Sequence, residues 1–268
     1  MPAFVIFTSG VLVMVLEMVG ARLMAPHVGT SSIVWTSLIG VVLAFLAIGA
    51  WLGGRLADKK LSTRTLAAIL AGAGLGATLT ALLHPLLAER VMESAPNMYL
   101  GAVFGALLHF AAPALPLGMV PPYIVLLSLA NLASSGATVG RLYALSTAGS
   151  IVGAFLGGLV LISYFSSTDI LFGSAAVCGL LSLLTCAKKN MPGILALLCG
   201  VAAGFGSASY NAWQTRQGAL PTLETPYSSI RVFEGFTDGG RRVRLIQTDP
   251  GKIQSGMYLD DPIELYAE

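Results

Sequence analysis

Ionisable side chains inside long apolar runs are the residues of this chain that could do chemistry. Glu17 lies near the middle of the first run, Arg22 lies near its end, and His109 lies within the fourth. Charges inside lipid are costly, so such residues face other helices or a polar cavity and often mark substrate or proton paths. Two interpretations of Glu17 and Arg22 stay open: a polar relay or substrate contact, or a structural partner for each other or another span. Arg22 could also snorkel to the interface, and for His109 a packed neutral imidazole is favoured over a proton site.

A second candidate cluster lies where the next apolar run ends, at Gly53, Gly54, Arg55 and Asp58. Its charges predict that the helix stops at the membrane surface. The pattern resembles the Gly-x-x-x-Asp-Arg/Lys loop of major facilitator transporters, where that loop ties neighbouring helices at the cytoplasmic face. A solvated helix end is the alternative interpretation.

The composition indicates a membrane protein. The chain has 268 residues, of which 55% are hydrophobic and 10% charged, whereas a soluble domain has about 25% charged residues. The net charge of +2 is too small to indicate a nucleic-acid partner. Cys178, Cys186 and Cys199 all fall in apolar runs, so we predict neither a disulfide framework nor a metal site. The first apolar run is too long for a signal peptide and is interpreted as a retained span.

Runs of about 20 apolar residues mark candidate spans. Seven are predicted, at about 3–25, 33–54, 65–88, 98–119, 139–163, 168–187 and 192–210. The segment 121–135 is shorter and begins with two prolines, which favours an interfacial or re-entrant piece. The predicted fold is therefore an all-α polytopic, transporter-like bundle of about seven transmembrane helices, with a small antiparallel β segment at its C-terminal end.

Basic residues predict the orientation of these spans. They cluster at 55–64, at Arg141 and at 188–189, which all fall on one side of a seven-span bundle. The positive-inside rule makes that side cytoplasmic. The N-terminus is then inside and the C-terminal tail outside, whereas counting 121–135 as a span would bring the tail inside.

Small residues at four-residue spacing predict where helices pack. They are Gly72 and Gly76; Gly101 and Gly105; Gly149, Gly153 and Gly157; and Ala196, Gly200 and Gly204. Such stripes let two helix backbones approach closely in lipid. Helix packing is favoured over a substrate path as their role.

The C-terminal part of the chain differs in kind from the apolar runs. Residues 1–210 form the predicted helical domain, 211–223 a polar linker and 224–268 a β-hairpin segment. Residues 229–234 and 242–248 alternate apolar and polar side chains, which is typical of half-buried strands. Asp238-Gly239-Gly240 lies between them and indicates a hairpin turn. About 45 residues without a staple make little core, so the open edges of this unit are expected to need a partner.

Three stretches point to a family when they are taken together. They are 17–29 with Trp35 and 53–58; Gly118-Met-Val-Pro-Pro122 with 140–153; and 224–232 with Gln254 and Asp260-Asp261-Pro262. This combination resembles the membrane-embedded spermidine synthase-like proteins, in which a multispanning region precedes a polyamine aminopropyltransferase domain. The match covers nearly the whole chain. The resemblance implies transfer of an aminopropyl group from decarboxylated S-adenosylmethionine to putrescine.

The same resemblance assigns roles in the tail. Gln254 resembles the β-domain glutamine that helps to hold the nucleoside donor, and Tyr266 with Glu268 resembles a Tyr-x-Glu pair near the active site. No Gly-x-Gly-x-x-Gly run follows a predicted strand, so the Rossmann-like catalytic part is not found in these 268 residues. We therefore expect no catalytic residue, no cofactor and no synthase activity from this polypeptide alone, which is truncated or completed by a separate chain.

Three hypotheses follow for the function. The first is an inner-membrane, multi-pass protein of the spermidine synthase-like family, partnered by the bilayer and by a separate or downstream catalytic domain. The second is a transporter for a small organic solute or a polyamine, with Glu17, Arg22 and His109 facing a cavity. The third is a non-catalytic anchor or scaffold. The family's donor substrate is cytosolic, whereas the charge pattern predicts that the tail lies outside.

Overall fold

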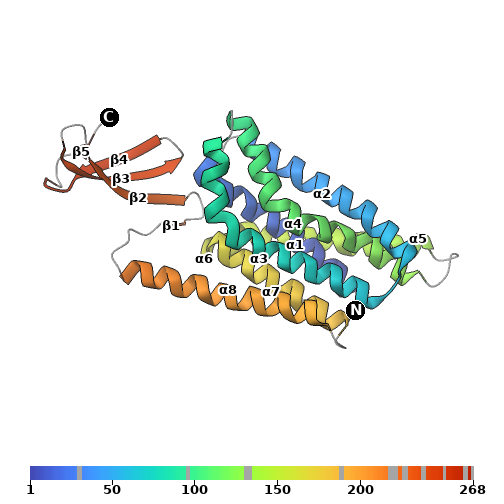
Figure 1. The fold of residues 1–268 in the computed structure, drawn as a ribbon. Coiled ribbons are helices and arrows are strands. Elements are labelled where there is room, and N and C mark those ends of the chain that lie inside the picture. Colours follow the sequence, from blue (N-terminus) through green and yellow to red (C-terminus); the bar gives the residue numbers. More distant parts are fainter. Residues whose placement is uncertain are drawn as a thin grey trace.

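The computed structural model describes residues 1–28, 32–94, 97–129, 135–186, 190–216, 223–224, 229–236, 240–249, 252–261 and 265–266. Long helices form most of it (Figure 1). They are α1 (Pro2–Val28), α2 (Ser32–Lys59), α3 (Thr63–Ser94), α4 (Met98–Ser128), α5 (Ser135–Phe155), α7 (Ser167–Thr185) and α8 (Met191–Arg216). A π-helical segment, Leu156–Leu161, continues α5 into the short α6 (Ile162–Tyr164).

The membrane bundle predicted from the apolar runs is confirmed. Among the described residues, six helical stretches are long and apolar enough to cross a bilayer, counting α5 through α6 as one. The seventh helix, α8, is 26 residues long, and its apolar part spans Met191–Gly206. It runs on to Arg216, so the first residues assigned to the linker are helical. The protein is a multi-pass membrane protein.

Helix α4 differs from the prediction because it does not end at residue 119. It continues to Ser128 as one helix of 31 residues with four prolines inside it, Pro113, Pro116, Pro121 and Pro122. Residues 121–128 are therefore its last turns and not a separate re-entrant piece. Proline is tolerated in membrane helices because neighbouring helices and local adjustment satisfy the freed backbone groups. The remaining residues of the predicted piece, 130–134, lie outside the described residues.

Close backbone contacts at small residues hold the helices together. A Cβ added to Gly149 or Gly153 of α5 would fall 2.0 or 2.4 Å from a carbonyl oxygen of α1. Gly76 of α3 meets the backbone of α4 at Ala112 in the same way, and Gly200 of α8 meets α7. Gly72, Gly157 and Gly204 have looser contacts, at 3.4 Å or more. The predicted packing role is thus confirmed for part of the stripes on α3, α5 and α8.

Buried hydrogen bonds add specific ties between helices. The hydroxyl of Tyr123, a residue with no exposed surface, donates to the carbonyl of Lys60 at 2.5 Å and accepts the Ser62 N–H at 2.8 Å. It thereby fixes the α2–α3 connection to α4. Ser182 of α7 donates to the Ala67 carbonyl of α3 at 2.6 Å, and the Asn190 amide donates to the Ser182 carbonyl at 2.8 Å.

The tail forms a five-stranded sheet in the simple order β1-β2-β3-β4-β5, with antiparallel neighbours. Its strands are β1 (Leu223–Glu224), β2 (Ser229–Phe236), β3 (Arg242–Asp249), β4 (Lys252–Tyr258) and β5 (Leu265–Tyr266). Val243 and Leu245 are buried, whereas Ile246 is exposed, so the predicted alternation holds in β3. Gly240, the last residue of the predicted hairpin turn, has φ +75, a left-handed conformation that glycine adopts readily. Asp238 and Gly239 lie outside the described residues.

The sheet and the N-terminus lie at opposite ends of the bundle (Figure 1). Consecutive long helices alternate in direction, so α8 ends at the opposite end from the first residue of α1. Strands β2 and β3 contact α1. The sheet is thus held against the helical bundle by contact as well as by the chain that follows α8.

Candidate functional site

A pair of histidines between α3 and α4 is the most distinctive polar cluster in the described part of the bundle. His109 of α4 is 3% exposed, and its Nε2 lies 3.2 Å from Nδ1 of His84. Its other ring nitrogen, Nδ1, lies 2.7 Å from the Gly105 carbonyl oxygen one turn earlier. Thr80 of α3 donates to the His109 carbonyl at 2.5 Å, which adds a second link between the helices. His109 is therefore packed and hydrogen-bonded at both ring nitrogens.

The structure places Arg22 in a different contact. This half-buried side chain donates from Nη1 to the carbonyl of Ile162, at the start of α6. The π-helical segment ends at Leu161, immediately before this carbonyl. Such segments change the local carbonyl pattern of a helix. Arg22 thus links α1 to the end of the α5–α6 helix, so its contact lies within the bundle.

Glu17 lies half-buried on α1, and the described residues give its carboxylate neither a hydrogen bond nor an ion pair. The polar partner that we expected for it is not seen among them. Glu17, Arg22 and His109 also do not share a contact there, because Arg22 binds α6 and His109 binds α3. Within the part of the chain that the structure describes, no hydrogen bond or ion pair joins the three residues into one polar site.

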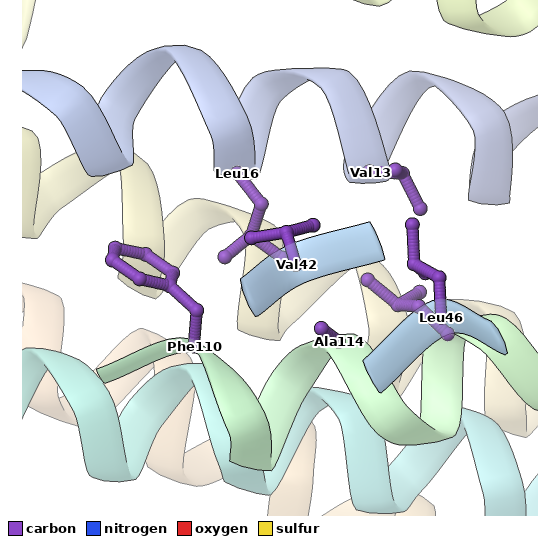
Figure 2. Close-up of a pocket in the computed structure, with 7 residues that line it drawn as sticks. Val13, Leu16, Val42, Leu46, Phe110 and Ala114 are labelled. Carbon is purple, nitrogen blue, oxygen red and sulfur yellow. The ribbon is translucent and has the colours of Figure 1, made fainter. Parts of the chain in front are cut away.

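A crevice between α1, α2 and α4 is lined by Leu16, the residue before Glu17 in the chain, and is apolar (Figure 2). It has no room for a water molecule. Its lining consists of Val13, Leu16, Val42, Leu46, Phe110, Ala114 and Leu117. Such a space is dry, because it has neither room nor polar partners for water.

The cluster at the end of α2 divides into packing and surface residues. Gly53 lies against the backbone of Met119, where a Cβ would meet the carbonyl oxygen at 2.5 Å, whereas Gly54 has no neighbour within 4 Å. Arg55 is exposed and stacks over Trp51, with 4.1 Å from its guanidinium carbon to the ring centroid. Asp58 is exposed. The tie between helices at this end comes from Gly53 and from Tyr123 rather than from the charges.

The sheet brings together two of the three tail residues singled out by resemblance. Tyr266 of β5 pairs with Gly256 of β4, two residues along the strand from Gln254. The two positions are therefore close on neighbouring strands. Glu268 lies outside the described residues.

Ion pairs on the sheet were not anticipated from the sequence. Arg242 and Arg244 both donate to Glu234, at 2.8 and 2.7 Å, and Arg241 pairs with Asp260 at 3.0 Å. Hydrogen bonds from Arg244 and then Arg242 lower the pKa of Glu234, and a hydrogen bond from Arg241 lowers the pKa of Asp260. The Glu234 pairs follow directly from strand register, since Glu234 lies opposite Arg244. Exposed pairs of this kind are surface features and not a sign of catalysis.

Comparisons with known proteins add no relative. No family model, no curated protein and no solved structure matches the chain. Among the described residues, no three histidine, cysteine or acidic side chains gather as metal ligands would. What is established is a multi-pass membrane protein with a packed helical bundle and an antiparallel sheet at one of its ends.

Proposed function

We propose that this chain is a membrane anchor for an aminopropyltransferase-type domain of the spermidine synthase-like family, with the sheet as the first unit of that domain. The observation that carries the proposal is the five-stranded antiparallel sheet that follows α8 and contacts α1. Gln254 and Tyr266, the two described positions that resemble substrate contacts, lie near each other on β4 and β5.

The role of the sheet is limited by the chemistry of aminopropyl transfer. An amine nitrogen of putrescine attacks the carbon next to the sulfonium of the donor, the carbon–sulfur bond breaks, and a base removes a proton from the amine. This needs a nucleoside-binding cleft and a positioned carboxylate, which we assign to a further domain or a separate chain. Gln254 would then contribute an amide to the nucleoside and Tyr266 would line the cleft.

The bundle supports an anchoring role because its described contacts are those of a packed scaffold. Helix α4 meets α2 at Gly53 and α3 at Gly76 through backbone contacts, and Tyr123 ties the α2–α3 connection. The crevice beside Leu16 is apolar and dry. An anchor of this kind holds the sheet at a membrane surface without a solute path.

We place the protein in the cell inner membrane. Arg55, Lys59, Arg64 and Arg141 lie at the N-terminal end of the bundle, which the positive-inside rule makes cytoplasmic. The sheet would then face the other side, whereas the family's donor substrate is cytosolic. The positive-inside rule and the location of the donor substrate thus predict opposite sides for the sheet, and a reporter fused after Glu268 distinguishes them. A cytoplasmic signal supports the enzyme-type domain, and an external signal favours a non-catalytic scaffold.

The enzymatic part is tested with the complete reading frame that contains this chain. The frame is expressed in a host without its own spermidine synthase, and washed membranes receive putrescine and decarboxylated S-adenosylmethionine. We expect spermidine, and Gln254→Ala should raise KM for the donor roughly tenfold, because about 1.4 kcal/mol of lost binding is a factor of ten. Gln247→Ala, on β3, is the matched control and should leave KM unchanged. Membranes that make no spermidine in any of these samples would contradict the proposal.

One observation favours a second candidate, a transporter for a polyamine or another small organic cation. The carboxylate of Glu17 lies in the middle of a span, and the described residues give it no hydrogen bond or ion pair. An uncompensated acid in a membrane helix is a functional hypothesis by default, and a carboxylate attracts a cationic solute. Reconstituted protein is tested for polyamine flux, with Glu17→Gln as the variant. Equal flux in both proteins, or none in either, would remove Glu17 from the functional residues.

A further inference from the structure

Exposed cations gather where α2 ends and α3 begins. Arg55, Lys59, Lys60 and Arg64 are all exposed, and Asp58 is the one acid among residues 50–70. No ion pair joins any of these side chains to another described residue. Four cations and one acid give this patch a net charge of +3, and the described residues do not neutralise it.

Two of these cations continue an exposed face of α2 that begins at a tryptophan. Trp51, Arg55 and Lys59 follow one another at four-residue spacing, so they lie on one side of the helix and form what we call the α2 stripe. The guanidinium carbon of Arg55 lies 4.1 Å from the centroid of the Trp51 ring. Gly53 packs on the opposite side of α2 against Met119 of α4. The α2 stripe therefore faces away from the bundle, and Trp51 is 56% exposed.

The order of the side chains along the α2 stripe matches the layers of a bilayer surface. Tryptophan on a membrane helix prefers the level of the lipid headgroups. Each four-residue step advances about 6 Å along a helix, so Arg55 and Lys59 lie at that level or beyond it. A guanidinium binds phosphate oxygens in a bidentate manner. We propose that the α2 stripe binds the headgroup of an anionic phospholipid from the bilayer, with its phosphate between Arg55 and Lys59 and its glycerol region beside Trp51.

The backbone that carries these cations is held in place. The Lys60 N–H donates to the Leu56 carbonyl at 2.8 Å, and the Lys60 carbonyl accepts the hydroxyl of buried Tyr123. The same hydroxyl accepts the Ser62 N–H. Binding a headgroup therefore orders side chains but not the connection between α2 and α3, which lowers the entropic cost of binding.

The positive-inside rule alone does not account for this arrangement. That rule requires Lys and Arg near the cytoplasmic ends of spans, and any position in a short loop serves it. Binding of a lipid headgroup also requires a cation on the flank of a helix that faces the bilayer. Arg55 meets this second requirement, because it stacks on exposed Trp51.

Fluorescence of Trp51 tests the proposal, because brominated lipids quench a tryptophan that they contact. Trp35 and Trp213, the other two tryptophans, are replaced by phenylalanine, and the chain is reconstituted in phosphatidylcholine vesicles. Brominated phosphatidylglycerol or brominated phosphatidylcholine is included at the same low mole fraction. One cation near a membrane surface favours an anionic lipid about fivefold, so Trp51 should report at least that enrichment of phosphatidylglycerol. Equal quenching by the two lipids would overturn the proposal.

A matched pair of substitutions separates the α2 stripe from general surface charge. Arg55→Gln should lower the enrichment at Trp51 severalfold. Arg141→Gln removes an exposed cation from the same end of the bundle but from α5, and it should leave the enrichment unchanged. An equal loss of enrichment in the two variants would assign the effect to general charge and refute a site on the α2 stripe.

Salt and phosphate check the site without a substitution in it. Molar sodium chloride should reduce the enrichment at Trp51 reversibly, because exposed charges are screened. Millimolar inorganic phosphate at constant ionic strength should leave it unchanged, since the occupant is a lipid. An enrichment that persists in molar salt, or that inorganic phosphate abolishes, would contradict a lipid headgroup held by Arg55 and Lys59.

Discussion

Gly149 of α5 lies so close to α1 that a Cβ on it would fall 2.0 Å from the carbonyl oxygen of Phe7. No side chain fits into that distance, so Gly149→Ala must push the two helices apart. Overpacking of this kind costs about 1–3 kcal/mol. Gly140→Ala on the same helix meets nothing within 4 Å and should be neutral. Unfolding in mixed micelles measures the difference, and equal stability of both variants would contradict the α1–α5 contact.

The Tyr123 hydroxyl should stabilise the α2–α3 connection. In Tyr123→Phe the Lys60 carbonyl and the Ser62 N–H lose their partner, and a hydrogen bond contributes about 0.5–1.5 kcal/mol. We expect lower thermal stability and faster proteolysis after Lys59 or Lys60. Tyr143→Phe is the control, since Tyr143 is 75% exposed. A Tyr123→Phe protein that resists protease as well as the wild type would show that the hydroxyl does not hold this connection.

The Ser182 hydroxyl should contribute to the packing of α7 on α3. Ser182→Ala removes the bond to the Ala67 carbonyl and one contact with the Asn190 amide. Interhelical hydrogen bonds in membranes contribute about 0.6 kcal/mol on average and at most about 1.7 kcal/mol, so the loss should lie in that range. Ser163→Ala, which loses only a bond within its own helical stretch, is the comparison. Steric trapping in bicelles measures the free energy of unfolding of both variants. A larger loss of stability in Ser163→Ala than in Ser182→Ala would contradict the role of the Ser182 hydroxyl in the packing of α7 on α3.

The sheet should weaken in acid because of its ion pairs. The pKa values of Glu234 and Asp260 are lowered in the folded protein from 4.5 and 3.8. The ion pairs therefore contribute their full stability at pH values above these ordinary pKa values, which the two carboxyls have in the unfolded chain. That contribution is lost as the pH falls through the lower pKa values of the folded protein. Amide exchange in β2 and β3 should speed up below about pH 4.5 relative to the intrinsic rate.

Glu234→Gln separates this effect from general acid unfolding. The variant should exchange faster at pH 7 and lose much of the pH dependence in β2 and β3. High salt should reduce the difference, because exposed pairs are screened. A pH dependence that is identical in the wild type and in Glu234→Gln would assign the acid sensitivity to other groups.

Local patterns in the sequence determined the elements. The apolar runs predict the long helices because each must satisfy its own backbone hydrogen bonds in lipid. The alternation in residues 242–248 predicts β3, since successive strand residues face opposite sides. The glycines at 149 and 153 predict a close helix contact but do not name its partner, which is α1. The prolines at 121 and 122 misled the interpretation, because a proline's effect in a membrane helix depends on its neighbours.

The tertiary structure decided which side chains meet. His84 and His109 stand 25 positions apart, and Arg22 binds a carbonyl 140 positions away. Hydropathy and spacing are properties of one segment, and they describe which face of a helix is apolar but not which helix it faces. Partner choice depends on the rotation and crossing of whole helices, and these are set by close packing of many side chains at once. For that reason the sequence indicated Glu17, Arg22 and His109 as candidates, and only the fold separated them into different surroundings.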